Sequence, residues 1–180
     1  MDLMVKARPL KLRDIEIKII NSLKKLARTR GSIDRLHLTQ DVKNELQKIG
    51  ETKGYASYAG RTKRTAHFHE FLWDFVWARQ KEDRRLKGAD PNKILSLPLI
   101  AEIEWGTSKQ HRAHDFEKLI FGEASLRLFV CRTRNEDDSA NALKLCRDIL
   151  SRATRPKRRR FLLIMVQDKP KKIIPQLWIR

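Results

Sequence analysis

Cysteine is scarce in this chain of 180 residues: only Cys131 and Cys146 occur, and no CxxC pair is present. A disulfide framework of the kind that staples small secreted domains is therefore excluded, because it needs several cysteines at fixed spacings. Cys131 lies in an apolar run and Cys146 in a helical pattern. We expect two buried thiols in a protein of a reducing compartment.

Long apolar runs are also missing. No stretch reaches the roughly 18 consecutive apolar residues of a membrane-spanning helix. The opening residues Met-Asp-Leu-Met-Val-Lys lack the layout of a secretory signal, so we expect a cytoplasmic protein without a membrane partner. Nothing in the chain resembles a glycine-rich phosphate loop, a nucleophile elbow or a dinucleotide fingerprint.

Acidic residues are few in comparison with basic ones. The chain has 22 Asp and Glu against 40 Lys and Arg, which gives a net charge of +18. A charge of this size favours a polyanionic partner. Nucleic acid is favoured over a membrane surface, because the basic residues occur along the whole chain and membrane binding usually needs an apolar insertion element or a lipid anchor.

The hydrophobic pattern predicts helices and strands in alternation. Helices are expected at 10–28, 39–50 (with Thr39 as N-cap), 114–121 and 141–150, and strands at 68–78, 97–105, 125–132, 161–166 and 173–179, with a short extended piece at 54–59. The run 161–166 is typical of a strand buried on both faces, and Pro175 puts the last strand at an edge. This order predicts an α/β fold with a central mixed sheet flanked by helices.

Three acids lie inside predicted strands: Asp74 in 70–77, and Glu102 and Glu104 in 97–105. Strand side chains alternate, so Glu102 and Glu104 share a face, roughly 6.5 to 7 Å apart. Burial and mutual repulsion raise carboxylate pKa values. A bound proton, a cationic side chain or a metal ion offsets the unfavourable negative charge. An all-oxygen cluster suits a hard cation such as Mg²⁺. Taken alone, Glu-x-Glu on a strand also fits a solvent-exposed face.

The order of elements and the three acids together resemble the restriction-endonuclease-like, or PD-(D/E)xK, nuclease superfamily over residues 38–132. The stretch Glu102-Ile-Glu104-Trp, followed by Asp115-Phe-Glu-Lys118-Leu, is similar to small bacterial proteins assigned to that group. We therefore expect one domain over 1–180. It would have an N-terminal helical extension at 1–33, a nuclease core at 38–132, and a C-terminal helix and two strands at 133–180 that complete the sheet.

The resemblance implies a Mg²⁺ or Mn²⁺ ion held by Asp74, Glu102, Glu104 and the carbonyl of Ile103. Glu104 occupies the position where the family usually has a lysine, and a tryptophan replaces the usual proline before Asp74. Two groups are open as the one that activates water: Glu104 itself, or Lys118 on the following helix.

Two further acids are weaker candidates beside this site. Glu45 lies on the preceding helix, where some relatives have an extra acid, and Glu70 shares a strand face with Asp74.

The function that the resemblance implies is a metal-dependent DNA endonuclease or nickase. Many members of the family dimerise to cut both strands, so a homodimer is a further implication. Two alternatives stay open: a nuclease-fold protein that binds DNA or RNA without cutting it, and a basic interaction protein whose acids are ordinary exposed residues.

Basic residues near the predicted site are expected to contact phosphates. Arg61, Lys63 and Arg64 precede the Asp74 strand, where a double-stranded DNA backbone would pass, and such contacts carry no sequence information. The basic run 155–160 either does the same or is simply solvated.

The histidine pairs His67-x-His69 and His111-x-x-His114 are interpreted as surface or phosphate-contacting residues. A structural zinc site is disfavoured, because no cysteines stand at matching spacing.

Overall fold

The computed structural model of the chain describes residues 12–29, 35–59, 72–82, 92–153 and 159–179. The elements in these residues are, in order, α1 (Asp14–Thr29), α2 (Arg35–Glu51), β1 (Ala56–Ala59), β2 (Phe75–Glu82), β3 (Asn92–Glu104), α3 (Lys109–Phe121), β4 (Leu126–Thr133), α4 (Glu136–Arg152), β5 (Arg160–Gln167) and β6 (Lys172–Ile179). The α/β class is confirmed. Among the described residues, no helix combines the length and the apolar character that crossing a membrane requires.

The six strands form one mixed sheet in which each strand lies beside its neighbours in sequence, in the order β1-β2-β3-β4-β5-β6. The pairs β3–β4 and β4–β5 are parallel and the other three are antiparallel. A parallel pair needs a crossover connection, and α3 and α4 supply the two crossovers. The carboxyl ends of β3, β4 and β5 and the start of β2 therefore meet at one end of the sheet, which we call the carboxyl edge.

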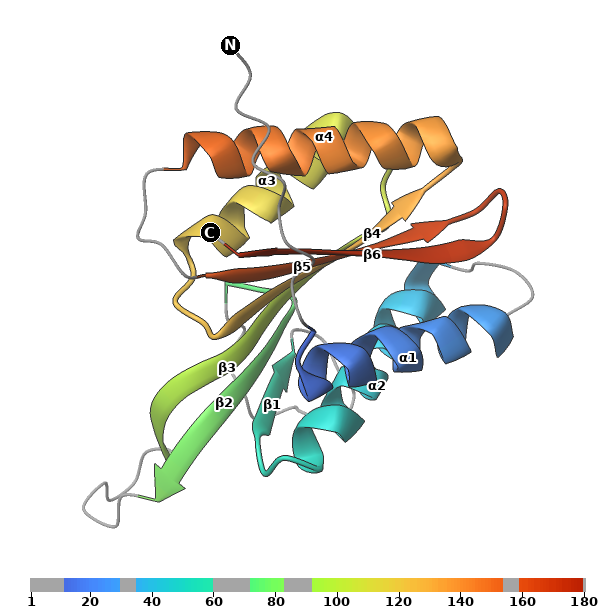
Figure 1. Cartoon of the computed structure of the whole chain (residues 1–180). Helices are drawn as coiled ribbons and strands as arrows, with labels where there is room; N and C mark the ends of the chain where they lie inside the picture. Colours follow the sequence, from blue (N-terminus) through green and yellow to red (C-terminus); the bar gives the residue numbers. More distant parts are fainter. Residues whose placement is uncertain (1–11, 30–34, 60–71, 83–91, 154–158, 180) are drawn as a thin grey trace.

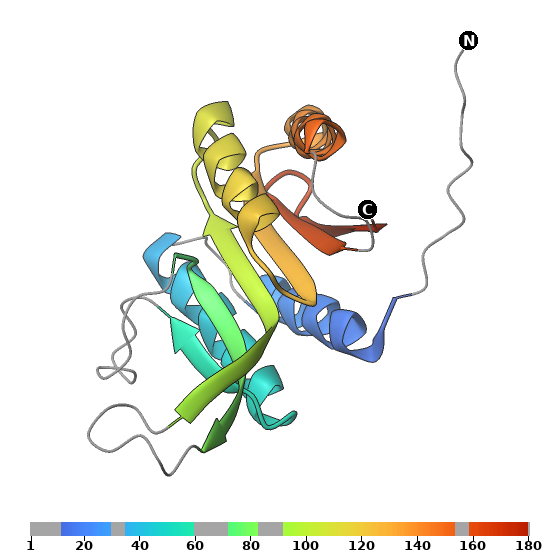
Figure 2. The same ribbon diagram turned by 90° about the vertical axis from the view of Figure 1, so that its left-hand side faces the viewer.

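Helices cover both faces of the sheet (Figure 1). Turning the molecule shows α3 and α4 on one side of the strands and α1 and α2 on the other (Figure 2). On β3, Ala101 and Ile103 pack into the core beneath α1 and α2, whereas Ile100 packs into the core beneath α3 and α4. Because strand side chains alternate, Glu102 and Glu104 point to the same side as Ile100, toward α3.

Strand β3 is longer than the sequence indicated, and β2 is shifted toward the C-terminus. The expected strand 68–78 is confirmed at 75–78 only, because 72–74 form a bend, β2 runs from Phe75 to Glu82, and 68–71 lie outside the described residues. Strand β3 begins at Asn92, five residues before the expected start. The added segment of β2, 79–82, is polar, and that of β3, 92–96, includes the exposed Ile94 and Leu95. Ladder pairing such as Gln80 with Ile94 holds both segments. Apolar enrichment cannot detect strands that project into solvent.

Three helices begin earlier than expected. Helix α2 begins at Arg35, so Thr39 is not its N-cap; its hydroxyl instead accepts a hydrogen bond from the Trp105 indole at 2.6 Å. Helices α3 and α4 each begin five residues before the expected starts, with Asn135 as the N-cap of α4. The first turns of α3 and α4 are polar and carry no apolar periodicity, which explains their late predicted starts.

The two C-terminal strands lie as predicted. Every residue of β5 is buried, as expected for a strand with helices over both faces. Strand β6 is the edge strand, with Pro175 paired opposite Ile164.

A buried ion pair ties α1 to β5. Arg160, part of the basic run 155–160, is neither solvated nor on a phosphate-binding surface, because its guanidinium donates two hydrogen bonds of 2.6 Å to the Glu16 carboxylate. Glu16 also accepts the backbone N–H of Arg13 at 2.8 Å. Both charged residues are buried. The N-terminal helix is therefore fixed against the sheet as part of the packed fold.

Glu16→Gln should lower the free energy of unfolding by about 3 to 5 kcal/mol, because it leaves the buried Arg160 charge without a counter-charge. Urea unfolding followed by circular dichroism measures the loss. The matched control is Glu136→Gln, which breaks a 2.7 Å pair between exposed Glu136 and Lys172 and should leave stability unchanged within error. Equal losses in the two variants would contradict this account.

Candidate active site

Two of the predicted acids meet at the carboxyl edge of the sheet. Phe75 at the start of β2 pairs with Ala101 on β3, so Asp74 and Glu102 stand next to that pair on neighbouring chain segments. Asp74 lies in the bend just before β2, not inside the strand as expected. Its carboxylate accepts the backbone N–H of Ile103 at 2.9 Å, and this bond fixes it against the end of β3.

Glu102 is an acid within the core, since only 1% of the residue is exposed. One carboxylate oxygen is 2.8 Å from the Lys118 ammonium. The other is buried and has no hydrogen-bond partner among the described residues. Burial raises the pKa of Glu102 to about 8; the bond to Lys118 acts in the opposite direction, and the charge of Asp74 raises the pKa further. Glu102 therefore holds a proton near neutral pH unless more positive charge is brought to it.

Lys118 reaches the acids from α3. Its ammonium lies 3.1 Å from Asp115, one helical turn earlier, as well as 2.8 Å from Glu102. About a quarter of the lysine side chain is exposed, so the ammonium has access to the surface. Asp115 was not among the predicted site residues, although its i,i+3 spacing from Lys118 is a signal for an ion pair on one helix face.

Glu104 has different partners from Glu102. Its carboxylate accepts the backbone N–H of Gly106. Burial raises the pKa of Glu104; the bond to Gly106 lowers it, a hydrogen bond with Asp115 raises it, and His111 lowers it. Glu104 thus faces the beginning of α3, and Asp115 connects it to the Lys118 and Glu102 pair.

Lys43 is a member of the site that sequence reasoning missed. It is largely buried on α2, and its ammonium lies 3.9 Å from Asp74. Helix α2 covers the opposite face of the sheet from α3, so Asp74 receives a cation from the far side. The available signal was a lysine next to the buried positions Val42 and Leu46.

Glu45 does not join this cluster. Its carboxylate is hydrogen bonded to Ser22 on α1 and to Lys48 one turn along α2. Those two hydrogen bonds, with Lys48 the stronger influence, lower its pKa. Glu45 therefore links the two N-terminal helices.

Close packing fixes the end of α3 that carries Lys118. The Trp73 indole donates to the Lys118 carbonyl at 3.3 Å, so the tryptophan that precedes Asp74 holds this helix. A Cβ on Gly122 would lie 2.1 Å from Ile100 and 2.7 Å from Trp73, which only a residue without a side chain avoids. The buried Arg127 guanidinium donates to three backbone carbonyls at the end of α3.

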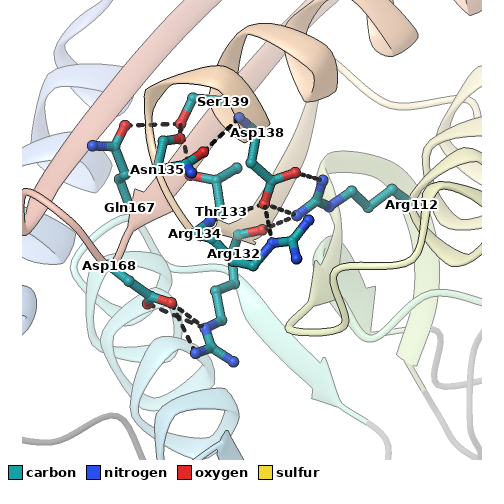
Figure 3. A network of polar contacts seen from close by, with 9 residues as sticks. All are labelled: Arg112, Arg132, Thr133, Arg134, Asn135, Asp138, Ser139, Gln167 and Asp168. Atoms are coloured by element: carbon teal, nitrogen blue, oxygen red, sulfur yellow. Dashed lines mark hydrogen bonds and ion pairs between the residues drawn. The ribbon is translucent and has the colours of Figure 1, made fainter.

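A polar network fixes the beginning of α3 (Figure 3). The buried Arg112 guanidinium donates to both oxygens of Asp138 on α4, at 2.7 and 3.0 Å, and to the Arg132 carbonyl at 2.6 Å. Asp138 also accepts the Arg134 backbone N–H at 2.8 Å. The hydrogen bond from Arg112 holds the pKa of Asp138 below its usual value. Because α3 is held at both ends, it presents Lys118 and Asp115 on a rigid element.

The donor set suits a hydrated hard cation. In the described parts of the chain, no three His, Cys, Asp or Glu side chains are grouped closely enough to enclose a metal ion. Mg²⁺, however, usually keeps several waters and binds through one or two carboxylates. Asp74 and Glu102 stand on neighbouring chain segments and provide two such carboxylates, and the resemblance implies the carbonyl of Ile103 as a further ligand. The unpartnered buried oxygen of Glu102 and its raised pKa are features that a bound cation would relieve.

Several predicted residues lie outside the described part of the chain. These are the phosphate-contacting candidates Arg61, Lys63 and Arg64, the acid Glu70, and the pair His67 and His69. Their predicted roles stay predictions. His111 and His114 are exposed residues of α3.

Comparison with known proteins adds no relative: no family model, no curated protein and no solved structure matches this chain. The fold and the site define an α/β protein with a six-stranded mixed sheet and a cluster of acids and lysines at its carboxyl edge.

The buried carboxyl of Glu102 should make stability depend on pH. Its pKa of about 8 in the folded protein exceeds the ordinary value of 4.5, so the folded state binds the extra proton between these values. The free energy of unfolding should therefore fall as pH rises from 4.5 to 8, by at most about 5 kcal/mol. Glu102→Gln should abolish this part of the slope in urea unfolding measured with EDTA present.

The matched control for the pH experiment is Glu117→Gln, an exposed position on the same helix as Lys118. It should keep the full slope of the parent protein. An identical slope in parent and Glu102→Gln would show that Glu102 titrates normally and would contradict the assigned burial.

Proposed function

We propose that this chain is a metal-dependent nuclease that hydrolyses phosphodiester bonds of DNA. The observation that carries the proposal is the buried carboxyl of Glu102, with the Lys118 ammonium at 2.8 Å and Asp74 beside it on the neighbouring segment. Structural ion pairs are normally satisfied at both ends, whereas one oxygen of Glu102 has no partner among the described residues. An acid with these properties in a basic protein is a candidate for metal and phosphate chemistry.

The arrangement of elements supports the resemblance to the PD-(D/E)xK superfamily. Helix α2 is followed by β1 and β2, then by β3 with its Glu-x-Glu pair, by α3 and by the parallel strand β4. The expected core at 38–132 falls within these elements, with one more short strand than predicted. The acids stand at adjacent strand ends and Lys118 on the next helix, which agrees with the family's site. We propose on this basis that the fold is restriction-endonuclease-like.

In this proposal, Asp74, Glu102 and the carbonyl of Ile103 hold a Mg²⁺ or Mn²⁺ ion. When bound, such an ion supplies Lewis acidity at the phosphate and lowers the pKa of a coordinated water. The bond from the Ile103 N–H keeps Asp74 oriented. Burial of Glu102 on a central strand keeps its carboxyl fixed. A metal ligand in an active site must be held in a precise position, so this rigidity favours catalysis.

Lys118 and Glu104 have separate tasks. The Lys118 ammonium, partly exposed, is placed to orient the attacking water or to stabilise negative charge on the phosphate. Glu104 has a raised pKa, and a general base works best when its pKa is near the working pH. Glu104 is therefore our candidate to accept the proton of the water.

A second candidate function is nucleic-acid binding without cleavage. One observation favours it: Lys118 and Lys43 already bring positive charge to Glu102 and Asp74, so the acids have cationic neighbours without a metal ion. The net charge of +18 would serve binding equally well.

The proposed function is tested by incubating supercoiled plasmid with the purified protein in Mg²⁺ or Mn²⁺. Metal-dependent nicking is expected, and EDTA should abolish it. Glu102→Gln should reduce the rate roughly 100-fold or more, the scale of removing one preorganised electrostatic group from an active site. Binding to plasmid should be kept or strengthened, because a negative charge near phosphate is removed.

The control in the nicking assay is Glu117→Gln, which removes the same charge from an exposed position of α3 and should cut like the parent. If Glu102→Gln cuts as fast as the parent, the site assignment is wrong. If plasmid is shifted but never cut with either metal, the second candidate function replaces the first.

A further inference from the structure

A basic cleft lies between the last turns of α1 and the turn that joins β5 to β6. Its volume is about 360 Å³. Six residues line it, and four of them are cationic: Lys24, Arg28, Lys171 and Lys172. The other two are Ala27 and Ile173. None of these residues belongs to the acid cluster or to the expected nuclease core at 38–132.

The cleft and the acid cluster lie at the same end of the sheet. Figure 1 shows the turn between β5 and β6 and the C-terminal end of α1 on the side to which the arrowhead of β4 points. Glu102 stands near the end of β3, and Lys172 begins β6 beside the end of β5. By the ladder register Lys172 is three strands from Glu102 and four residues further toward the carboxyl edge, which corresponds to about 20 Å in the plane of the sheet. The cleft lies on the α1 side of the sheet, whereas Glu102 faces α3, so the two are joined around the carboxyl edge.

The helix dipole and ion pairing explain only part of the positive charge in the cleft. Arg28 in the last turn of α1 is favoured by the helix dipole, and Lys172 pairs with Glu136 at 2.7 Å. Lys24 and Arg28, however, are like charges one turn apart on the same helix, an arrangement that is mildly destabilising. They face two lysines from a separate element across one cleft. A concave site lined by a single sign of charge concentrates ligands of the opposite sign.

The surface between the cleft and the acids carries charges of both signs, because α4 begins there with Glu136, Asp137 and Asp138. Arg134 follows the end of β4, and its side chain is 67% exposed, with Asp138 3.6 Å away. Figure 3 shows Arg134 beside Arg132, which is held by Asp168. Arg132 and Arg134 are each paired with an acid, so the excess positive charge at this edge lies mainly in the cleft itself.

We propose that the α1 and β5–β6 cleft binds backbone phosphates of double-stranded DNA whose scissile bond lies at the Glu102 cluster. A separation of about 20 Å corresponds to roughly six base pairs along one strand. The cleft thus anchors the same duplex outside the reacting phosphate, and it does so without reading sequence. This inference rests on the proposed function for the identity of the ligand.

The test compares two double variants in duplex binding by fluorescence anisotropy, with EDTA present and over a range of salt concentrations. The duplex has about 20 base pairs, roughly two helical turns. Lys24→Ala with Arg28→Ala should weaken binding about tenfold or more and reduce the slope of log affinity against log salt by about two. Lys171→Ala with Lys172→Ala, on the other wall of the cleft, should act in the same direction.

The matched control is Lys144→Ala with Arg147→Ala on α4. It removes one lysine and one arginine from exposed helix positions, as the α1 variant does. The salt slope of this control should equal that of the parent. Equal losses in the α1 and α4 variants would show that only net charge matters and would overturn the proposal. The same variants are also measured for binding to anionic vesicles. If the cleft variants lose binding to the vesicles but bind the duplex like the parent, the cleft binds a membrane surface and the proposal is overturned.

Failure of this inference is separable from failure of the proposed nuclease, because binding is measured without metal and without cleavage. A protein that binds duplex through the cleft but never nicks plasmid would refute the nuclease and leave the cleft assigned. A protein that nicks plasmid while its α1 variant binds duplex like the parent would refute the role of the cleft and leave the nuclease supported.

Discussion

The contact between the Glu102 carboxyl and the Lys118 ammonium is the constraint on which the rest of the site depends. A carboxyl with 1% exposure cannot be ionised in the core without a nearby cation, and burial raises its pKa to about 8 even with Lys118 at 2.8 Å. Breaking a buried pair by removing one partner is strongly destabilising. The fold must therefore keep α3 and β3 in register, and it must do so at the end of the sheet where solvent can enter.

Several contacts serve this purpose, and they come from different parts of the chain. The parallel pairing of β3 with β4 makes α3 a crossover, which brings the helix back over the end of β3. The Trp73 indole and the Arg127 guanidinium hold the far end of α3, and Arg112 holds its beginning through Asp138. These contacts are consistent with a site in which one cationic helix faces acids on rigid strands, as the proposed chemistry requires.

Much of the fold could be predicted from the local sequence pattern. The features that could not be predicted depend on contacts between residues distant in the sequence. The continuous apolar run of β5 and the proline of β6 predict a central and an edge strand, and both predictions are confirmed. Alternation along β3 correctly puts Glu102 and Glu104 on one face. The extension of β2 and β3 could not be predicted, because backbone pairing rather than apolar burial holds its mostly exposed residues. Lys43 and Arg160 were missed because their burial depends on acids distant in the sequence, Asp74 and Glu16.

We propose above all that Asp74 and Glu102 hold a divalent cation. The most direct test is anomalous diffraction from crystals of the protein soaked in Mn²⁺. The account predicts an anomalous peak within bonding distance of carboxylate oxygens of both residues, with the Lys118 ammonium moved away from Glu102. If no peak is found there and Lys118 stays bonded to Glu102, the cluster is an ion-pair network of the core and the claim is wrong.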